Sequence, residues 1–265
     1  MLPAFEAAGD PAAPSVAVFV HGILGSKSNW RGFLRRLVRS RPDVYAVALD
    51  LRNHGESPKA PGPHTLEACA RDLTELVGHV GRCDVVVGHS FGGKVVLRWM
   101  EMKPKGLAQA WILDTPPGPR RTEGAEVERV LAAVSDVPMP IPSRSALVDA
   151  LRRRGLSEAI ALWMTTNLKP AVAGLDWRFR LEAIPEMLAS FASTDLWYVI
   201  EDTGEVDVHV VRGGRSDRFS PDELQHLDRV VAAGAVRAHI LEKAGHWLHA
   251  DDPEGLLELL VAEMP

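Results

Sequence analysis

The stretch Asp84-Val85-Val86-Val87-Gly88-His89-Ser90-Phe91-Gly92-Gly93-Lys94, residues 84–94, decides the fold. Its β-branched opening predicts a buried strand, and a helical pattern over residues 94–102 follows at once. Between them stands G-x-S-x-G, the nucleophile-elbow pattern, in which a strand turns sharply into a helix. The two flanking positions are glycine because a side chain there would clash with the neighbouring strand or helix. A glycine-rich turn with an incidental serine is the other interpretation, and the strand and helix on either side argue against it.

Length and composition set limits on the function. The 265 residues suffice for one large α/β domain, or for a core domain with an insertion. A net charge of −5 argues against nucleic acid as a partner. Cys69 and Cys83 fit small buried hydrophobic residues better than a disulfide. Without a signal-peptide pattern or an apolar stretch long enough for a bilayer, we expect a cytoplasmic protein with no membrane span, as a monomer or weak homo-oligomer.

Apolar runs alternate with amphipathic helical patterns along most of the chain. This alternation predicts an α/β fold, with a mostly parallel sheet flanked by helices. The expected strands, besides the one before Gly88, are a weak edge strand near Leu2–Ala8 and Ser15–Val20, Val44–Leu49, Leu107–Leu113, Val206–Val211 and Ala235–Leu241. The expected helices of this part are Asn29–Ser40, 66–80, Leu224–Ala233 and Leu256–Met264.

The alternation stops between residues 119 and 204, where the sequence is helical in pattern and shows no obvious strand. The expected helices are Glu123–Ser135, Ser143–Arg153, Ser157–Asn167 and Ile184–Val199. A helical insertion within a β/α alternation is typical of a lid. We therefore predict a core in two parts, residues 1–118 and 205–265, and a helical lid over 119–204 that adds no strand to the main sheet.

A second loop is a candidate for stabilising negative charge. His21-Gly22-Ile23-Leu24 follows directly after the strand Ser15–Val20. In chains with a nucleophile elbow, this is where the second amide of the oxyanion hole lies. We nominate the backbone N–H groups of Ile23 and Phe91, and expect His21 to have a structural role. His54, in the polar loop after Val44–Leu49, is a less favoured candidate for catalysis.

A serine hydroxyl needs a base to take its proton, and the base is most often a histidine. Of the ten histidines, His246 alone follows the last predicted strand, in the turn Gly245-His246-Trp247. The usual chain order for this elbow is serine, acid, histidine. His246 is therefore the predicted base.

The acid that orients the base has two candidates. Asp217 follows the strand Val206–Val211, in Gly214-Arg215-Ser216-Asp217, and we favour it on order and spacing. Asp114, at the end of the strand Leu107–Leu113, is the alternative acid. Each also has a structural interpretation, Asp217 as a helix cap and Asp114 as a turn residue.

Taken together, these motifs resemble the α/β-hydrolase superfamily over essentially the whole chain. They are His21-Gly22, Asp50-x-Arg52-Asn53-His54-Gly55-x-Ser57, residues 88–94, and Gly245-His246-Trp247-x-His249-Ala250. They most resemble small intracellular serine esterases and thioesterases, a branch in which the sixth core strand often leads into G-G-x-S. The chain has Gly213-Gly214-Arg215-Ser216 there, and Asp217 follows. With no metal-ligand spacing or dinucleotide fingerprint, the resemblance implies no cofactor.

The resemblance implies a serine hydrolase that cleaves small-molecule carboxylic esters or thioesters through an acyl-enzyme on Ser90. His246 would be the base, with Asp217 or Asp114 as its acid, and the amides of Ile23 and Phe91 would hold the oxyanion. Three alternatives stay open: a triad-based lyase, a C–C bond hydrolase, and a small-molecule receptor that keeps the triad. Periodicity does not place the lid, so the acyl and leaving groups are not specified.

Overall fold

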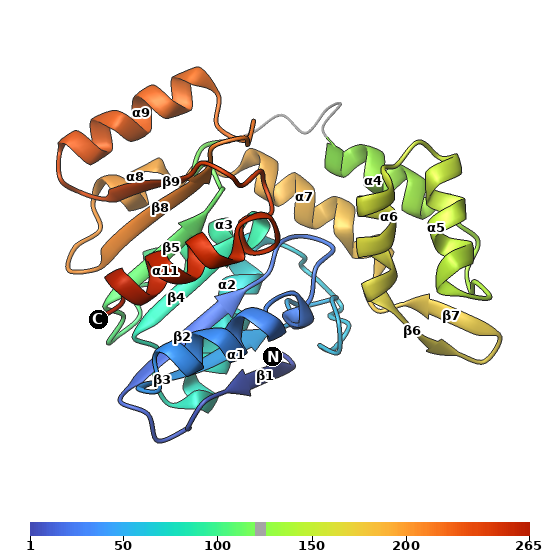
Figure 1. The fold of residues 1–265 in the computed structure, drawn as a ribbon, viewed down its shortest axis with the longest axis horizontal. Helices are drawn as coiled ribbons and strands as arrows, with labels where there is room; N and C mark the ends of the chain where they lie inside the picture. The colour runs from blue at the N-terminus through green and yellow to red at the C-terminus, as the bar shows by residue number, and fades with distance from the viewer. Residues whose placement is uncertain (120–125) are drawn as a thin grey trace.

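The computed structural model describes residues 1–119 and 126–265, and its central element is a seven-stranded sheet (Figure 1). The strand order is β1-β3-β2-β4-β5-β8-β9, with β1 antiparallel to β3 and every other pair parallel. The strands are β1 (Phe5–Ala8), β2 (Ser15–Val20), β3 (Val44–Leu49), β4 (Val85–His89), β5 (Gln109–Leu113), β8 (Asp207–Gly213) and β9 (Arg237–Leu241). The predicted mostly parallel sheet is confirmed.

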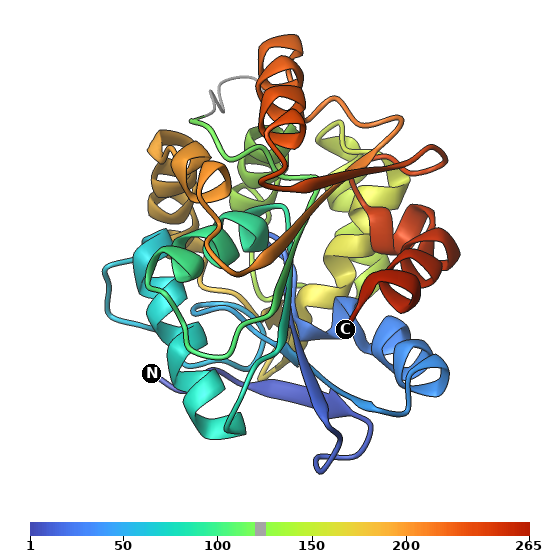
Figure 2. The same ribbon diagram turned by 90° about the vertical axis from the view of Figure 1, so that its left-hand side faces the viewer.

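Helices cover both faces of this sheet, as Figure 2 shows in side view. On one face, α1 (Arg31–Ser40) and α11 (Pro253–Glu263) enclose the core that contains Trp30 and Trp111. On the other, α2 (Leu66–Val80) and α3 (Phe91–Glu101) pack with the rest of the core. Both faces being covered explains why β2, β4 and β5 read as continuous apolar runs rather than alternating ones. Three further helices are α8 (Trp197–Glu201), α9 (Pro221–Ala232) and α10 (Leu248–Asp251).

Most of residues 126–204, which we call the inserted segment, lies to one side of the sheet, whereas its last helix, α8, lies beside α9 (Figure 1). The segment contains α4 (Glu126–Ser135), α5 (Arg144–Arg153), α6 (Glu158–Met164), α7 (Ile184–Ser193), α8, and the strands β6 (Leu168–Ala171) and β7 (Gly174–Trp177). Its strands pair only with each other, so it gives no strand to the main sheet. The start of the helix expected from Glu123 lies outside the described residues.

The inserted segment differs from expectation in two places. The expectation of helices alone was wrong, because β6 and β7 form an antiparallel hairpin. Pro170 is incompatible with a helix interior, and Gly174, at φ 129°, makes a turn that other residues rarely adopt. The single helix expected over 184–199 is also interrupted, because Thr194 leaves α7 in extended conformation before α8 begins.

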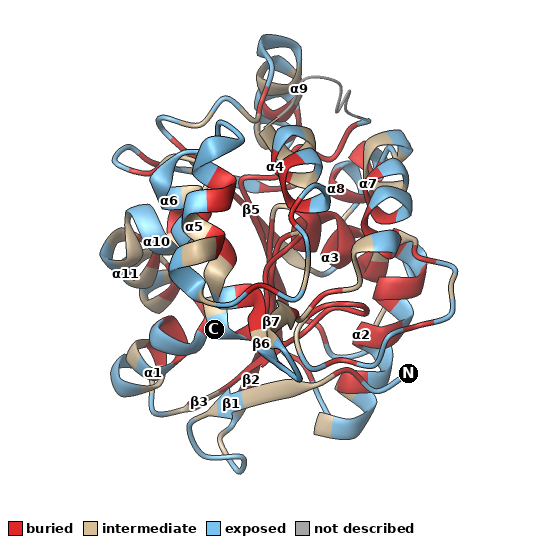
Figure 3. Ribbon diagram, turned by 90° about the vertical axis from the view of Figure 1, so that its right-hand side faces the viewer, coloured by how far each residue is buried: buried red, intermediate tan, exposed pale blue. Residues whose placement is uncertain are grey.

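Buried residues concentrate in the sheet and on the inner sides of the helices, and exposed ones on the outer helix faces (Figure 3). The inserted segment has a buried interior of its own, including Leu147, Leu151 and Met164, that is continuous with the larger core cluster. Its two ends meet, because the Leu196 N–H donates to the Pro117 carbonyl at 3.0 Å. None of the helices in the described parts of the chain is both long and apolar enough to cross a bilayer.

Candidate active site

Ser90 stands at the turn between β4 and α3 in a strained conformation, with φ 54° and ψ −120°. Positive φ is costly for a residue with a side chain, so the surrounding packing must hold it in place. A Cβ on Gly92 would lie 2.5 Å from the Val20 carbonyl oxygen, and one on Gly88 would meet the Gly92 carbonyl. The clash that the sequence predicts at both flanking glycines is therefore present, and Ser90 is aimed clear of the sheet.

The predicted base lies against the predicted nucleophile. The distance from His246 Nε2 to Ser90 Oγ is 3.0 Å, and on the other side of the ring Nδ1 lies 2.8 Å from Asp114 Oδ2. With Nδ1–H donating to the carboxylate, Nε2 is free to accept the serine proton. Ser90, His246 and Asp114 thus have the geometry of an activated nucleophile, its base and an orienting acid.

Asp114 is held in place by burial and by several hydrogen bonds. Its side chain is fully buried, and its own backbone has φ 50°, which turns the chain directly at the end of β5. Besides His246, the Ser216 hydroxyl donates to Oδ2 at 2.5 Å and the Gly213 N–H donates to Oδ1 at 3.1 Å. Burial raises the pKa of the Asp114 carboxyl above its usual value, and the two hydrogen bonds oppose that rise.

The preference for Asp217 as the acid is corrected by this geometry. The Asp217 side chain is 97% exposed, and its nearest charged group is Arg218, with Nε and Oδ1 4.0 Å apart. The loop after β8 turns its preceding residue inward instead, and that residue is Ser216. A carboxylate in solvent cannot fix the ring of His246, so the alternative acid, Asp114, takes the place beside the histidine.

Ser216 was not singled out from the sequence, although a signal for it was present. The G-G-x-S pattern places its hydroxyl one residue before Asp217, at the point where the loop crosses Asp114. The same hydroxyl accepts the Arg218 N–H at 3.2 Å. Ser216 therefore ties the loop after β8 to the carboxylate after β5, and a serine at this position indicates a partner for an acid on the neighbouring strand.

The loop after β2 is fixed from both sides at Leu24. Its N–H donates to His54 Nε2 at 3.1 Å, and its carbonyl accepts from Asn167 Nδ2 at 2.6 Å. Leu24 has φ 57°, which turns the loop, and Ile23 beside it lines the same cavity as Ser90 and Phe91. Asn167 is buried in the inserted segment and was not predicted, because nothing local in the sequence links it to residue 24.

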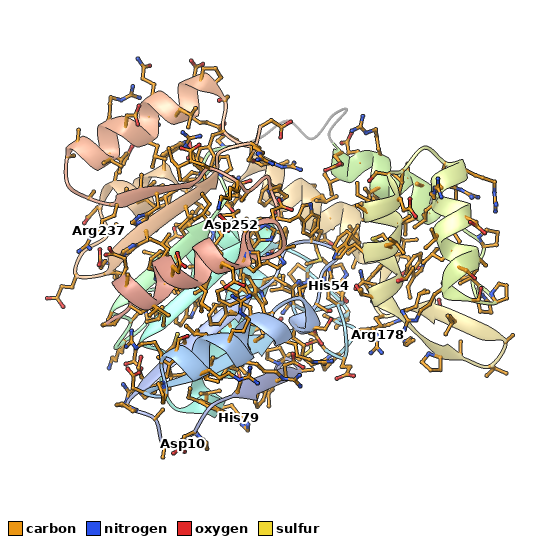
Figure 4. All side chains as sticks on the ribbon, viewed as in Figure 1. Asp10, His54, His79, Arg178, Arg237 and Asp252 are labelled. Atoms are coloured by element: carbon orange, nitrogen blue, oxygen red, sulfur yellow. The ribbon has the colours of Figure 1, made fainter. Side chains whose placement is uncertain are left out.

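His21 and His54 hold loops as neutral rings. His21 Nε2 accepts the Leu51 N–H at 3.0 Å, and its Nδ1 donates to the Gly22 carbonyl at 2.7 Å. Burial lowers the pKa of His21, and burial together with the nearby His21 ring lowers the pKa of His54 to about 3. Figure 4 labels His54 between the sheet and the inserted segment. Neither imidazole contacts Ser90 in this arrangement, which agrees with a structural role for both.

His89, the residue before the nucleophile, supports His246 from behind. Its Nε2 donates to the His246 carbonyl at 2.7 Å, and the two rings lie 4.8 Å apart. Burial, and then the neighbouring His246, lowers the pKa of His89 to about 3, so its ring is neutral. The elbow therefore fixes the backbone of the loop that carries His246 as well as presenting Ser90.

A partly open cavity lies directly over these groups. Its polar atoms gather at Ser90, His246 and Asp114, and at Glu126 and Arg218, which lie 3.5 Å apart. The rest of its wall is mainly apolar, and the residues of the inserted segment that supply it are Val127, Val130, Ile160, Trp163, Leu188 and Phe191. An apolar cleft with a few convergent polar groups is the usual form of a small-molecule site.

Nucleophilic and metal-binding groups elsewhere are few. Cys69 and Cys83 are both buried; burial raises the pKa of the Cys69 thiol to about 12 and that of Cys83 further. Such thiols are inert at neutral pH. Within residues 1–119 and 126–265, no three His, Cys, Asp or Glu side chains are grouped as a metal site.

Comparison with known proteins identifies a family and several similar proteins. A family model described as "Alpha/beta hydrolase family" matches residues 17–259. A zebrafish protein named sn-1-specific diacylglycerol lipase ABHD11 is 29% identical over 97% of this chain and 80% of its own length. Esterase YbfF of Escherichia coli strain K12 is 27% identical over 93% of this chain and 91% of its own length. A solved structure titled "Marine microorganism esterase" has a TM-score of 0.83 and 21% identity, covering 98% of both chains.

Proposed function

Because the chain belongs to the alpha/beta hydrolase family, we propose that it is a serine hydrolase that cleaves carboxylic esters or thioesters with an apolar acyl group. The observation that carries the proposal is the line of contacts Ser90–His246–Asp114 at the floor of a mainly apolar cavity. The relatives named as a lipase and an esterase support the same class of reaction.

In the proposed first step, Ser90 Oγ attacks the carbonyl carbon while His246 Nε2 takes its proton. Asp114 holds the ring in the tautomer that can accept that proton, and it stabilises the imidazolium that forms. The N–H groups of Ile23 and Phe91 are proposed to receive the oxyanion. Phe91 is the first residue of α3, where the helix leaves its amides without partners within the helix. One such donor is typically worth about 10²–10³-fold in rate.

In the second step, His246 gives its proton to the leaving alcohol or thiol, and the acyl group stays on Ser90. Water enters, loses a proton to His246 and attacks the acyl carbon, which releases the acid and restores the serine. The inserted segment is proposed to serve as a lid, whose apolar side chains line the cavity and reduce its access to water.

The test is a hydrolysis panel with purified protein, using p-nitrophenyl esters and acyl-CoA thioesters graded from acetyl to decanoyl. We expect turnover with at least one series, and a loss of roughly 10³-fold or more in Ser90→Ala. A matched control is Ser193→Ala, on the exposed side of α7, which should keep wild-type rates. Near-normal hydrolysis by folded Ser90→Ala would exclude the proposal.

Three alternatives are separated by trapping the intermediate. A slow ester should leave an acyl group on Ser90, seen as a mass increase that is absent in Ser90→Ala. A lyase that uses His246 as a simple base would show turnover without that adduct. A C–C bond hydrolase would cleave a ketone substrate with a higher kcat/KM than any ester of the panel. A receptor would respond stoichiometrically to a ligand, without repeated turnover.

A further inference from the structure

Lys94, one turn into the nucleophile helix α3, is a fully buried lysine. A buried ammonium is costly unless its N–H groups are paired. Its Nζ donates to three backbone carbonyls, those of Gly118 at 2.6 Å, Phe191 at 2.8 Å and Thr194 at 2.9 Å. An ammonium has three N–H donors, so three carbonyls match what it can give.

The three carbonyls come from two separate stretches of the chain, one before the inserted segment and one at the end of α7. Gly118 lies just before the segment begins, in the turn after β5. Phe191 and Thr194 belong to the last turn and the C-cap of α7, where a helix leaves its carbonyls without partners. The negative end of the helix dipole also stabilises a cation at this position. Lys94 therefore caps α7 and joins both α7 and the turn after β5 to α3, the helix that follows Ser90.

The helix that Lys94 caps forms part of the cavity wall. Leu188 and Phe191, one turn apart on α7, both line the cavity. The Phe191 ring lies with its centroid 4.5 Å from Nζ, and it stacks on Phe91 with ring centroids 5.8 Å apart. The ammonium of Lys94 thus contacts the Phe191 ring. That ring lines the cavity and stacks on Phe91, the residue after Ser90.

We propose that Lys94 is a positioning residue for substrate selection: by capping α7, it holds Leu188 and Phe191 at the distance from Ser90 that long apolar acyl groups require. The inference rests on the proposed function, since it concerns the acyl group of that reaction. We expect a short acyl group bonded to Ser90 to make fewer contacts with Leu188 and Phe191 than a long one, so its turnover should depend less on the cap.

The experiment compares wild type with Lys94→Met, which keeps the length of the side chain and removes the charge and the donors. We expect kcat/KM for a decanoyl ester to fall about tenfold or more, while that for the acetyl ester changes less than about threefold. Amide hydrogen exchange over residues 184–193 should speed up about tenfold, with exchange in β4 unchanged. Lys105→Met, an exposed lysine beyond α3, is the matched control and should show neither change.

Lys94→Gln guards against a variant that does not fold, because it removes the charge but keeps an amide donor, and it should show the same two changes at smaller size. An equal loss on both esters would overturn the inference, since general damage to the site does not distinguish chain length. An unchanged ester ratio with unchanged exchange in α7 would overturn it as well. If wild type turns over no ester, the proposed function fails, and the exchange measurement still decides whether Lys94 holds α7.

Discussion

The core side of the cavity holds its functional groups with buried hydrogen bonds, whereas the inserted segment faces the same space mainly with apolar side chains. On the core side, Asp114 accepts three hydrogen bonds, and Leu24 is bonded through both its N–H and its carbonyl. On the inserted side, contacts such as those of Val130, Ile160 and Leu188 have no required direction. Under the proposed function, we therefore expect the kind of reaction to depend on the core, and the choice of acyl group to depend on the insertion.

The largest expected effect comes from replacing Asp114, the acid on the core side. Asp114→Asn should lower kcat by roughly 10³-fold or more, because an amide can donate to His246 Nδ1, favour the wrong tautomer and leave the imidazolium without a counter-charge. Asp217→Asn is the matched control and should change kcat less than about twofold, since its side chain is exposed. Both are measured as kcat with one activated ester. A greater loss in Asp217→Asn would exchange the roles of the two aspartates.

The next effect concerns stability at low pH, and it tests whether buried histidines of the core side are neutral in the folded protein. His54 and His89 are buried with pKa values of about 3, whereas an unfolded histidine titrates near 6.5. Between these values the unfolded chain binds more protons, so the free energy of unfolding should decrease as pH falls from about 6.5 toward 3. Each residue contributes up to about 1.4 kcal/mol per pH unit.

Urea unfolding at a series of pH values measures this slope. His54→Gln should reduce this slope by the equivalent of up to about one bound proton. His79→Gln, on the exposed face of α2, serves as the surface control. A slope unchanged by loss of His54 would mean that this ring is protonated in the folded state.

A smaller effect is expected where the two sides meet, at Asn167. Asn167→Leu removes the donor to the Leu24 carbonyl and leaves that buried group unpaired, so the loop that carries Ile23 should lose its fixed position. We expect kcat to fall about tenfold with KM nearly unchanged, because the oxyanion forms only in the transition state. Thr166→Val, at the exposed neighbouring residue, is the control. A rise in KM alone would assign Asn167 to substrate binding instead.

The smallest effect tests the inserted side by itself. Trp163 lines the cavity from α6 and packs edge-on against Trp247 at 4.5 Å between ring centroids. Trp163→Ala should enlarge the cavity on its apolar side. The ratio of kcat/KM between decanoyl and acetyl esters should then change about three- to tenfold, with acetyl turnover nearly constant. Loss of acetyl turnover to the same degree would show that this wall also supports the reacting groups.

The sequence indicated the elbow and the position of His246 because the signals for both are local. The elbow glycines are required by clashes with atoms nearby in the fold, and the strand before Ser90 is apolar because both of its faces are covered. His246 followed from its place after the last strand. These features depend on a few adjacent residues and on the order of elements along the chain.

What the sequence did not predict depends on contacts between distant residues. Asp114 and Asp217 both follow strands, and only the tertiary path of the loop after β8 directs Ser216 inward and Asp217 outward. Asn167 meets Leu24 across 143 residues. The hairpin of β6 and β7 was concealed by a helical pattern on either side, although Pro170 and Gly174 mark it.

The hydrogen bond between Leu196 and Pro117 has a consequence for how such a chain can diversify. When a segment leaves and rejoins a fold at adjacent points, it can be replaced without altering the path of the surrounding strands. Long stretches between these two points can be lengthened, shortened or exchanged between relatives without realigning the sheet. A transplant cut at Pro117 and Leu196 would carry the acyl-facing wall to another scaffold while the host keeps its own reacting groups.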